Sequence, residues 1–405
     1  MAEQLSYVLI TPYTLAKSRT GGIISRLLAR TGCELVAARM FAPTEKLIKE
    51  YAETIVISDD PWERKVQELI REYVLTKMSP DHRTGARRRV MMLLFKGEDA
   101  VRKVREVVGF FYKDRYSGET IRDTYGDFVF DDDGELVYFE PAILAPPSTK
   151  NIEEKLKIWA KYSETDGGIL EGVVKYPNGV VPQKTLVIIK PDNFRFPSGR
   201  PGNVMDYFSR TGLFIIAIKV HHMSVSEALE FYAPVREILR TKLLEPAQLK
   251  AKAAIEKEMG IKLPAEIESK IGEMLSPLYG DAQFNNIVKF MSGYKPEELP
   301  QEKWKEPGTE KCIVLVYEGV DAIKKIRDVL GPTDPSKAPP GSIRREFGST
   351  IMTNAAHASD APESVIREMK IVKPSENNFK KIIENFLKQT STPHKPTQKE
   401  VTITS

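Results

Sequence analysis

The feature of this sequence that most constrains its fold is an internal duplication. Four short blocks of the N-terminal half recur in the C-terminal half in the same order. The paired blocks are Tyr7–Pro12 with Leu186–Pro191, Arg30–Gly32 with Arg210–Gly212, Gly97–Arg105 with Gly319–Arg327, and Thr120–Arg122 with Ser342–Arg344. Self-similarity of this kind indicates that one structural unit occurs twice along the chain.

The two copies differ in length. Arg30 and Arg210 are 180 residues apart, whereas Arg105 and Arg327 are 222 apart, so the second copy holds about 42 additional residues. These residues, at about 239–281, are rich in Ala, Lys, Glu and Leu, which predicts two inserted helices. We expect a first domain at 1–148, a linker at 149–182, a second domain at 183–375, and a C-terminal helix with a disordered tail at 376–405.

Each copy alternates short strand-like runs with helix-like stretches. The runs Thr185–Lys190, Leu213–Val220 and Cys312–Tyr317 are rich in Val, Ile and Leu, as buried strands are. Between them, Ser224–Tyr232 begins with a residue that caps helices. This pattern favours an antiparallel sheet with helices packed on it.

The composition argues against several classes of protein. The 405 residues contain no apolar run long enough to cross a membrane, and the first residues lack the pattern of a signal peptide. Cys33 and Cys312 lie in apolar strand-like runs, which predicts buried thiols and a reducing, cytoplasmic location. The net charge of +4 is small for this length and does not favour nucleic acid as the main partner.

The chemistry of the chain is concentrated around His357. Arg344 and Asn354 precede this histidine, and an uncharged imidazole is a good nucleophile near neutral pH. Ser359 follows it, and Glu368 lies eleven residues further on, where the next helix could turn its carboxylate back to orient the ring. A histidine alone is more often structural than catalytic, but these neighbours indicate transfer of a phosphoryl group through the ring.

Three more polar residues are candidate phosphate ligands. Lys190 ends a strand-like run, Arg327 lies on an amphipathic helix, and Thr333 follows Gly-Pro in a loop. Each also has a simpler interpretation, as a solvated charge or a turn residue. The sequence contains no Walker loop and no protein-kinase signature, so phosphotransfer must follow another design. The pair His221-His222 does not predict a metal site, because adjacent strand residues point to opposite faces.

The residues around His357 resemble the active-site motif of the nucleoside diphosphate kinase family. That motif, Asn-x-x-His-Gly-Ser-Asp-Ser, appears as Asn354–Ala361, and Gly341–Arg344 stands upstream at the family spacing. The resemblance covers about Gln183–Val372 apart from the insertion, and more faintly Leu5–Ser148. It implies a mixed α/β protein with two tandem ferredoxin-like βαββαβ domains, each a four-stranded antiparallel sheet with helices packed on it.

The resemblance also implies a mechanism and a set of ligands. His357 would take the γ-phosphoryl group of a nucleoside triphosphate and pass it to a nucleoside diphosphate, with Mg²⁺ bridging the nucleotide phosphates and no metal site made by the protein alone. The residues implied to hold phosphates and ribose are Lys190, Arg327, Thr333, Arg344 and Asn354. Those implied to surround and brace the histidine are Tyr232, Ser359 and Glu368.

The sequence departs from the family pattern at several positions. Ala358 and Ala361 replace a glycine and a serine, and the family's Phe-Phe pair, which stacks on the base, appears as Gln283-Phe284. Alanine is small enough to be tolerated, and Phe284 is the residue left for stacking. These departures keep open an alternative function as a nucleotide-binding scaffold or regulatory protein with little turnover. A further alternative is a histidine phosphocarrier that delivers to a protein.

The first copy lacks groups that this chemistry needs. Thr11 replaces the strand-end lysine, and no histidine follows Arg122 at the required place, although Arg105 and Arg122 themselves remain. We therefore expect the first copy to be catalytically silent and to pack against the second. The resulting internal pseudo-dimer would be the building block of a homo-oligomer.

Overall fold

The structure is a computed structural model that describes residues 3–111, 118–132 and 136–391. In this part of the chain the strands form two four-stranded antiparallel sheets and one two-stranded sheet. The strands are β1 (Glu3–Ile10), β2 (Glu34–Phe41), β3 (Val90–Glu98), β4 (Asp127–Phe130), β5 (Leu136–Glu140), β6 (Ile143–Leu144), β7 (Gln183–Ile189), β8 (Phe214–His221), β9 (Cys312–Gly319) and β10 (Ala356–Ala358).

Both large sheets have the strand order of a ferredoxin-like βαββαβ fold. The order is β2-β3-β1-β6 in one sheet and β10-β7-β9-β8 in the other. In each copy, therefore, the first strand lies between the third and the fourth, and all neighbours are antiparallel. The prediction of two tandem ferredoxin-like α/β domains is confirmed.

The two copies also share unusual backbone conformations. Asp99 and Asp321 precede corresponding helices with φ of 53° and 54°. Ala142 and Ala355, each just before the last strand of its sheet, have φ of 58° and 69°. Positive φ is uncommon for residues other than glycine, so its recurrence at matched positions indicates that the backbones follow the same path.

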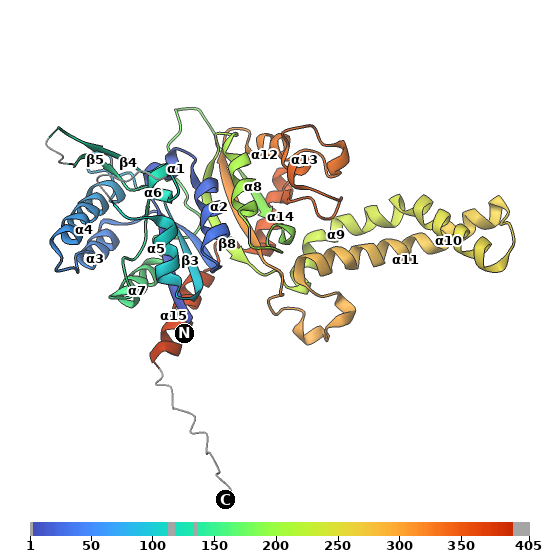
Figure 1. Ribbon diagram of the computed structural model, residues 1–405. Coiled ribbons are helices and arrows are strands. Elements are labelled where there is room, and N and C mark those ends of the chain that lie inside the picture. Colours follow the sequence, from blue (N-terminus) through green and yellow to red (C-terminus); the bar gives the residue numbers. More distant parts are fainter. Residues whose placement is uncertain (1–2, 112–117, 133–135, 392–405) are drawn as a thin grey trace, which may run out of the picture. The chain divides into compact units, whose positions relative to one another are not determined.

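The chain forms two compact units, neither of which is continuous in sequence. Unit 1 comprises residues 1–15, 33–173 and 376–405, and unit 2 comprises residues 16–32 and 174–375. The helices, labelled in Figure 1, are α1 (Pro12–Ala16), α2 (Thr20–Arg30), α3 (Glu45–Glu53), α4 (Pro61–Tyr73), α5 (Ala100–Val108), α6 (Ile121–Tyr125), α7 (Ile152–Tyr162), α8 (Arg200–Ser209), α9 (Val225–Lys242), α10 (Leu244–Met259), α11 (Ala265–Ser292), α12 (Ala322–Leu330), α13 (Ile343–Phe347), α14 (Pro362–Val372) and α15 (Asn378–Ser391).

Two helices are grouped by packing rather than by sequence order. α2, which comes from the first copy, packs on α8 within unit 2, and α15, which follows the second copy, packs on α7 and β2 within unit 1. Glycines allow the close approach of α2 and α8. A Cβ atom on Gly21 would lie 2.5 Å from the backbone nitrogen of Asp206 and 2.6 Å from the carbonyl oxygen of Gly202. The domain limits drawn from the sequence remain a prediction.

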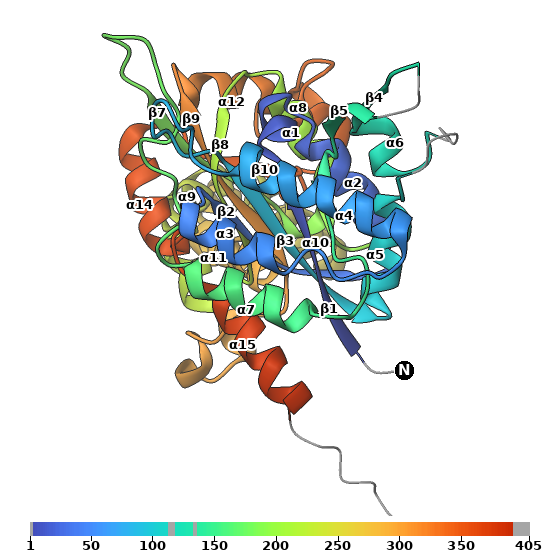
Figure 2. The ribbon, with the colours of Figure 1, turned by 90° about the vertical axis from the view of Figure 1, so that its left-hand side faces the viewer.

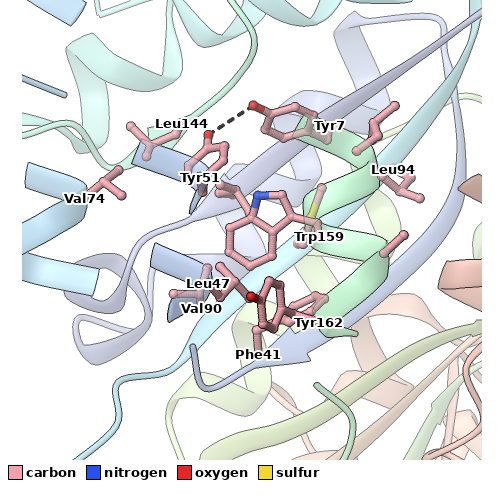
Figure 3. Close-up of a cluster of buried hydrophobic side chains, with 14 of the residues drawn as sticks. Tyr7, Phe41, Leu47, Tyr51, Val74, Val90, Leu94, Leu144, Trp159 and Tyr162 are labelled. Carbon is pink, nitrogen blue, oxygen red and sulfur yellow. Dashed lines mark hydrogen bonds between the residues drawn. The ribbon is translucent and has the colours of Figure 1, made fainter. Parts of the chain in front are cut away.

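The core of unit 1 lies between its sheet and helices α3 and α7, which Figure 2 shows in front of the strands. Trp159 of α7 is fully buried and makes edge-to-face contacts with Phe41 and Tyr51, at centroid distances of 4.9 and 5.4 Å (Figure 3). Burial of an aromatic side chain stabilises the fold by ~1.5–3 kcal/mol. Helix α7, in the segment between the copies, is therefore part of a core.

The insertion of unit 2 is a helical hairpin. The end of α9, all of α10 and most of α11 form it, and Figure 1 shows α10 and α11 side by side. Arg236 and Arg240 of α9 each bind Asp281 of α11 with a contact of 2.8 Å. The two guanidinium groups hold the pKa of Asp281 well below its usual value. This ion-pair cluster fastens the base of the hairpin.

The described helices, the two cysteines and the C-terminal segment can be compared with what the sequence predicts. Within the described ranges, no helix combines the length and the apolar character needed to span a lipid bilayer. Cys33 and Cys312 are buried thiols. The predicted C-terminal helix is α15, and the rest of the predicted tail, residues 392–405, lies outside the described residues.

We predict that Gly21→Ala destabilises the protein by about 1–3 kcal/mol, because the added methyl group overlaps backbone atoms of α8 that cannot move independently. Urea unfolding measures the change. Gly22→Ala is the matched control, because it lies next to Gly21 on the same helix, is half-buried and gains the same helix propensity of about 1 kcal/mol. Equal effects of the two substitutions would contradict the close packing of α2 on α8.

Candidate active site

His357 lies on β10, the edge strand of the sheet in unit 2. β10 runs antiparallel to β7 and pairs His357 with Ile188. β7 ends at Ile189, so the next residue, Lys190, reaches the same end of the sheet, where its N–H donates to the carbonyl oxygen of Ala355 at 2.9 Å. Strand pairing thus brings together two candidate residues that are far apart in the sequence.

The imidazole of His357 is oriented by Glu368 of α14. Its Nε2 lies 2.8 Å from Oε2 of Glu368, and the hydroxyl of Ser359 donates to the same oxygen at 2.7 Å. The side chain of Glu368 is 4% exposed and that of His357 is 24% exposed. A carboxylate at Nε2 keeps the ring proton on that nitrogen, so Nδ1 carries the free lone pair of the neutral ring.

Helix α14 is held at its C-terminal end by a buried lysine. Nζ of Lys219, on β8, donates to the carbonyl oxygens of Val372 and Lys373 at 3.1 and 3.3 Å. A cation there satisfies carbonyls that lack partners in the helix and interacts favourably with the helix dipole. Sequence analysis missed Lys219. A lysine in the middle of an apolar strand is the signal that could have identified it.

Two aromatic rings border the histidine. The ring of Phe231 packs edge-on against His357 with centroids 4.9 Å apart, and the ring of Tyr232 lies at 6.3 Å. The hydroxyl of Tyr232 is buried without a hydrogen-bond partner among the described residues, and burial raises its pKa. The structure therefore brings Tyr232 beside the histidine and adds Phe231, which the motif did not indicate.

Lys190 and Asn354 form a buried polar pair. Nζ of Lys190 donates to Oδ1 of Asn354 at 2.9 Å and to the carbonyl oxygen of Met352, and it lies 4.8 Å from the centre of the Phe290 ring. The amide of Asn354 donates in turn to the carbonyl oxygen of Thr333 at 3.1 Å. Lys190 is 7% exposed, and burial lowers its pKa to about 7. The two oxygens that accept hydrogen bonds from Lys190 are neutral, so its positive charge can still bind an anion.

Two arginines approach the histidine strand from α12 and α13. Arg344 donates to the carbonyl oxygens of Gly331 at 2.9 Å and Ala356 at 3.2 Å, while its Nε is buried without a partner in the described part of the chain. Burial, together with the charge of Arg327, lowers the pKa of Arg344 to about 10. Arg327 itself is half exposed and lies 4.0 Å from Asp360. Neighbouring guanidinium groups with donors to spare are suited to bind an anion.

A strained turn precedes the histidine strand. Ala355 has a φ of 69°, and its peptide groups are held by two side chains that sequence analysis missed. Asp192 accepts from the N–H of Ala355 at 3.2 Å, and Asn193 donates to its carbonyl oxygen at 2.7 Å. Such strain costs ~1–3 kcal/mol and persists only where the surroundings fix it. Ala358, by contrast, lies in strand β10, where alanine is easily accommodated.

Phe284 is not available to a ligand. Its ring is 2% exposed within the helical hairpin, where Arg236 lies 5.6 Å from the ring centre, and this burial does not fit stacking on a base. Gln283 instead lines a cavity of about 560 Å³ together with Ile351 and Met352. Adjacent residues of a helix point in different directions, so only one of the pair could face this space.

Strand register also identifies what the first copy has in place of the histidine. In unit 1, β6 pairs with β1 as β10 pairs with β7, and Leu144 faces Leu9 as His357 faces Ile188. Leu144 therefore stands at the position of His357. A leucine side chain has no lone pair, so this position of the first copy offers no nucleophile.

Comparisons with known proteins agree with this geometry. A family model described as Nucleoside diphosphate kinase matches residues 298–377. A nucleoside diphosphate kinase from Nitrosospira multiformis is 31% identical over 198 residues, 49% of this chain and 96% of the relative. One from Desulfotalea psychrophila is 30% identical over 188 residues, 46% of this chain and 93% of the relative. The chain belongs to the nucleoside diphosphate kinase family.

The match to the nucleoside diphosphate kinase family covers about half of the chain. A crystal structure of an NDP kinase from Pyrobaculum aerophilum is 28% identical and covers 47% of this chain and 95% of that chain, with a TM-score of 0.32. The residues matched by the family model include seven of the predicted site residues. These are Arg327, Thr333, Arg344, Asn354, His357, Ser359 and Glu368.

We predict that Lys190 makes the stability of the protein depend on pH. In the unfolded chain a lysine titrates near ~10.4, whereas in the folded chain Lys190 titrates near pH 7. Between these values the unfolded state binds the additional proton, so stability rises with pH, by at most about 1.4 kcal/mol per pH unit. Below pH 7 both states are protonated and the contribution is constant.

Urea unfolding at pH 7 and pH 9 tests this dependence. Relative to the wild type, Lys190→Met should show a smaller increase between the two values, because methionine does not titrate, whereas Lys155, with a pKa lowered to about 8, still does. Lys370→Met, at an exposed position of α14, is the control and should keep the wild-type slope. A slope unchanged by Lys190→Met would show that Lys190 is not buried as a titrating group.

Proposed function

We propose that this chain is a nucleoside diphosphate kinase that works through a phosphohistidine at His357. The observation that supports this most directly is the hydrogen bond from Nε2 to Glu368, because it leaves Nδ1 unprotonated on a partly exposed ring. Lys190 and Arg344 lie at the same end of the sheet and supply positive charge for phosphate oxygens.

The transfer takes place in two half-reactions. Nδ1 of His357 attacks the γ-phosphorus of a nucleoside triphosphate, a nitrogen–phosphorus bond forms, and the bond to the bridging oxygen breaks as the diphosphate leaves. Nδ1 carries no proton, so none has to be removed from it. Glu368 stabilises the positive charge that develops on the ring. In the second half-reaction, the terminal phosphate oxygen of another nucleoside diphosphate attacks the phosphohistidine and restores the neutral ring.

The cations of the site act on the phosphate oxygens. Lys190, with a pKa lowered to about 7, becomes fully charged when phosphate approaches, because a neighbouring negative charge raises the pKa of a lysine. Arg344 has a free Nε–H donor, and Arg327 is half exposed beside it. Charge that is fixed before the reaction stabilises the transition state without reorganisation.

Mg²⁺ fits this site as a companion of the nucleotide. Among the described residues no group of three or more His, Cys, Asp or Glu side chains could hold a metal ion. Asp360 is an exposed carboxylate near Arg327, and one carboxylate together with substrate phosphates and waters is the donor set that Mg²⁺ prefers. When bound, Mg²⁺ would neutralise phosphate charge, while Arg327, Arg344 and Lys190 would hold the phosphates in place.

The nucleobase is assigned to the cavity lined by Gln283, Ile351 and Met352. Met352 accepts a hydrogen bond from Lys190, so this cavity begins beside the proposed phosphate site. Its walls offer an aliphatic surface and an amide in place of an aromatic ring. A base held in this way has less stacking area, which favours weak discrimination among bases.

Two other functions compete with this proposal. A nucleotide-binding regulatory protein with little turnover is favoured by the glutamine at 283 and by the hairpin. A phosphocarrier that serves a protein is favoured by the same histidine chemistry. The wider proposal includes a cytoplasmic location, supported by two buried thiols, and a homo-oligomer built from an internal pseudo-dimer, supported by the duplicated fold.

We predict that His357→Ala abolishes the acid-labile phosphate that forms on the protein with γ-labelled ATP, because alanine provides no nucleophile. The wild-type label should be discharged by GDP without any added protein. His82→Gln is the control, since His82 is an exposed histidine of unit 1, and it should label like the wild type. Circular dichroism checks that both variants are folded.

The outcomes separate the three functions. Wild-type binding of nucleotide without labelling would favour the regulatory function, and discharge only by a protein partner would favour the phosphocarrier. Labelling of His357→Ala at the wild-type level would show that another residue is the nucleophile.

We predict that Glu368→Gln slows formation of the phosphohistidine by about 10- to 100-fold, the range found when a partner that orients a functional imidazole is lost. A neutral amide stabilises the charged ring less than a carboxylate does. Single-turnover labelling measures the rate, and nucleotide affinity should change little. Glu363→Gln, at an exposed position on the same helix, is the control. A normal rate in Glu368→Gln would remove this carboxylate from the mechanism.

A further inference from the structure

A cavity in unit 1 occupies the place that the candidate active site occupies in unit 2. Its volume is about 230 Å³, and its lining includes Leu144, which stands at the position of His357. The lining also includes Arg105 and Arg122, the two arginines that the first copy retains. The first copy has therefore kept an arginine-lined cavity after losing the nucleophile.

Lys155 replaces the carboxylate that would orient a histidine. Glu368 follows His357 by eleven residues, and Lys155 follows Leu144 by the same number. The helices also correspond, because α7 packs on α3 as α14 packs on α9. Both side chains are buried, with 3% exposure for Glu368 and 2% for Lys155. A histidine–carboxylate pair has become a leucine–lysine pair, which reverses the charge of the site.

The arginines of the two copies are placed alike. NH1 of Arg122 donates to the carbonyl oxygen of Gly109 at 2.6 Å, as Arg344 donates to Gly331. In both arginines Nε is buried without a partner among the described residues. The ring of Phe111 lies 3.9 Å below the guanidinium of Arg122. An arginine with an unpaired Nε–H therefore occurs in both copies, including the first copy, which has no histidine at the position of His357.

Further buried donors line the same cavity without an acceptor. Nζ of Lys155 makes no hydrogen bond or ion pair with any residue that the structure describes. Tyr7 and Tyr51 bond to each other at 3.0 Å (Figure 3), and since two hydroxyls carry two protons, one proton is left without an acceptor in the described part of the chain. These three side chains and Arg122 are each at most 3% exposed. Buried donors without acceptors are costly, so their gathering points to a ligand rich in acceptor oxygens.

The rest of the lining is mainly apolar and aromatic, with Gln67 and Glu63 as polar members. Trp62, Ile70 and Phe110 contribute to it, and Trp62 and Phe110 remain partly open to solvent. Glu63 is the carboxylate among the described lining residues, and it is exposed and accepts from the hydroxyl of Ser58 at 2.8 Å. Burial lowers the pKa of Lys155 to about 8, and the nearby charge of Glu154 opposes this shift only in part.

We propose that unit 1 binds a compact organic anion in this cavity, with an oxyanion head at Lys155, Arg122 and the tyrosine pair and an apolar body against the aromatic wall. The head is a carboxylate or a phosphate monoester. The volume is below the roughly 300–1,000 Å³ of pockets for drug-sized ligands, so the body has one or two rings. Since Leu144 cannot accept a phosphoryl group, the ligand is held and not consumed.

Isothermal titration of the full chain with 1-naphthoate, 1-naphthyl phosphate and neutral 1-naphthol tests the proposal. Lys155→Met should weaken binding of the preferred anion by about 10- to 100-fold, the effect of losing a charged hydrogen bond. Lys157→Met, on the same helix but 63% exposed, should bind like the wild type. Arg344→Met removes a cation from the proposed phosphate site of unit 2 and therefore identifies any part of the titration that arises there and not in the unit 1 cavity. The ratio of the two anion affinities shows which head the site prefers.

Two results would overturn the proposal. One is equal affinity of an anion for the wild type and Lys155→Met, and the other is binding of 1-naphthol as tight as that of the anions. Tyr51→Phe is a second variant that keeps the ring and removes one hydroxyl, and it should weaken the anion several-fold. Thermal unfolding of each variant without ligand shows whether the cavity is still folded.

Discussion

The candidate active site depends on one carboxylate oxygen of Glu368 that is shared by His357 and Ser359. This oxygen determines which ring nitrogen carries the proton and which one is free. It can do so because the C-terminal end of α14 is fixed by Lys219, a buried cation on β8 at the opposite edge of the sheet from β10. The reactivity of a partly exposed histidine therefore rests on two buried charges that no substrate touches.

Buried lysines without an ion pair among the described residues recur in both copies. Lys190 in unit 2 and Lys155 in unit 1 are almost inaccessible to solvent, and burial lowers the pKa of each. A folded chain bears the cost of such groups only when something else requires them. An anion relieves the cost in both cases, because it restores the charged form. In both proposed sites, the stability of the protein and the binding of an oxyanion would thereby be linked through the same side chains.

Much of the fold and of the site could be predicted from the sequence, and the failures have identifiable causes. Repeated blocks and apolar runs were enough for two antiparallel sheets, and the motif around His357 led to most of the polar groups near it. Phe284 was a poor candidate because a one-residue shift along a helix turns a side chain by about 100°, which spacing alone does not reveal. Asp192 and Asn193 were missed because they act on a strained peptide at Ala355, and strain has no signature in a sequence. The packing of α2 in unit 2 was missed because contacts between distant segments are not local information.

The residue of the first copy that corresponds to His357 was identified from strand pairing, because the sequences alone do not align there. Blocks of similar residues end before Leu144, and no motif marks it. The ladder between β6 and β1 nevertheless assigns it, because hydrogen-bonded partners are counted from the duplicated strands and not from side-chain identity. Counting eleven residues onward from Leu144 and from His357 gives Lys155 as the counterpart of Glu368. In the proposed mechanism, the carboxylate and the imidazole of the second copy exchange a phosphoryl group, whereas the leucine and the lysine of the first copy are proposed only to hold an anion. These two exchanges, together with Thr11 in place of Lys190, distinguish the copy that we propose to transfer a phosphoryl group from the copy that we propose to bind an anion.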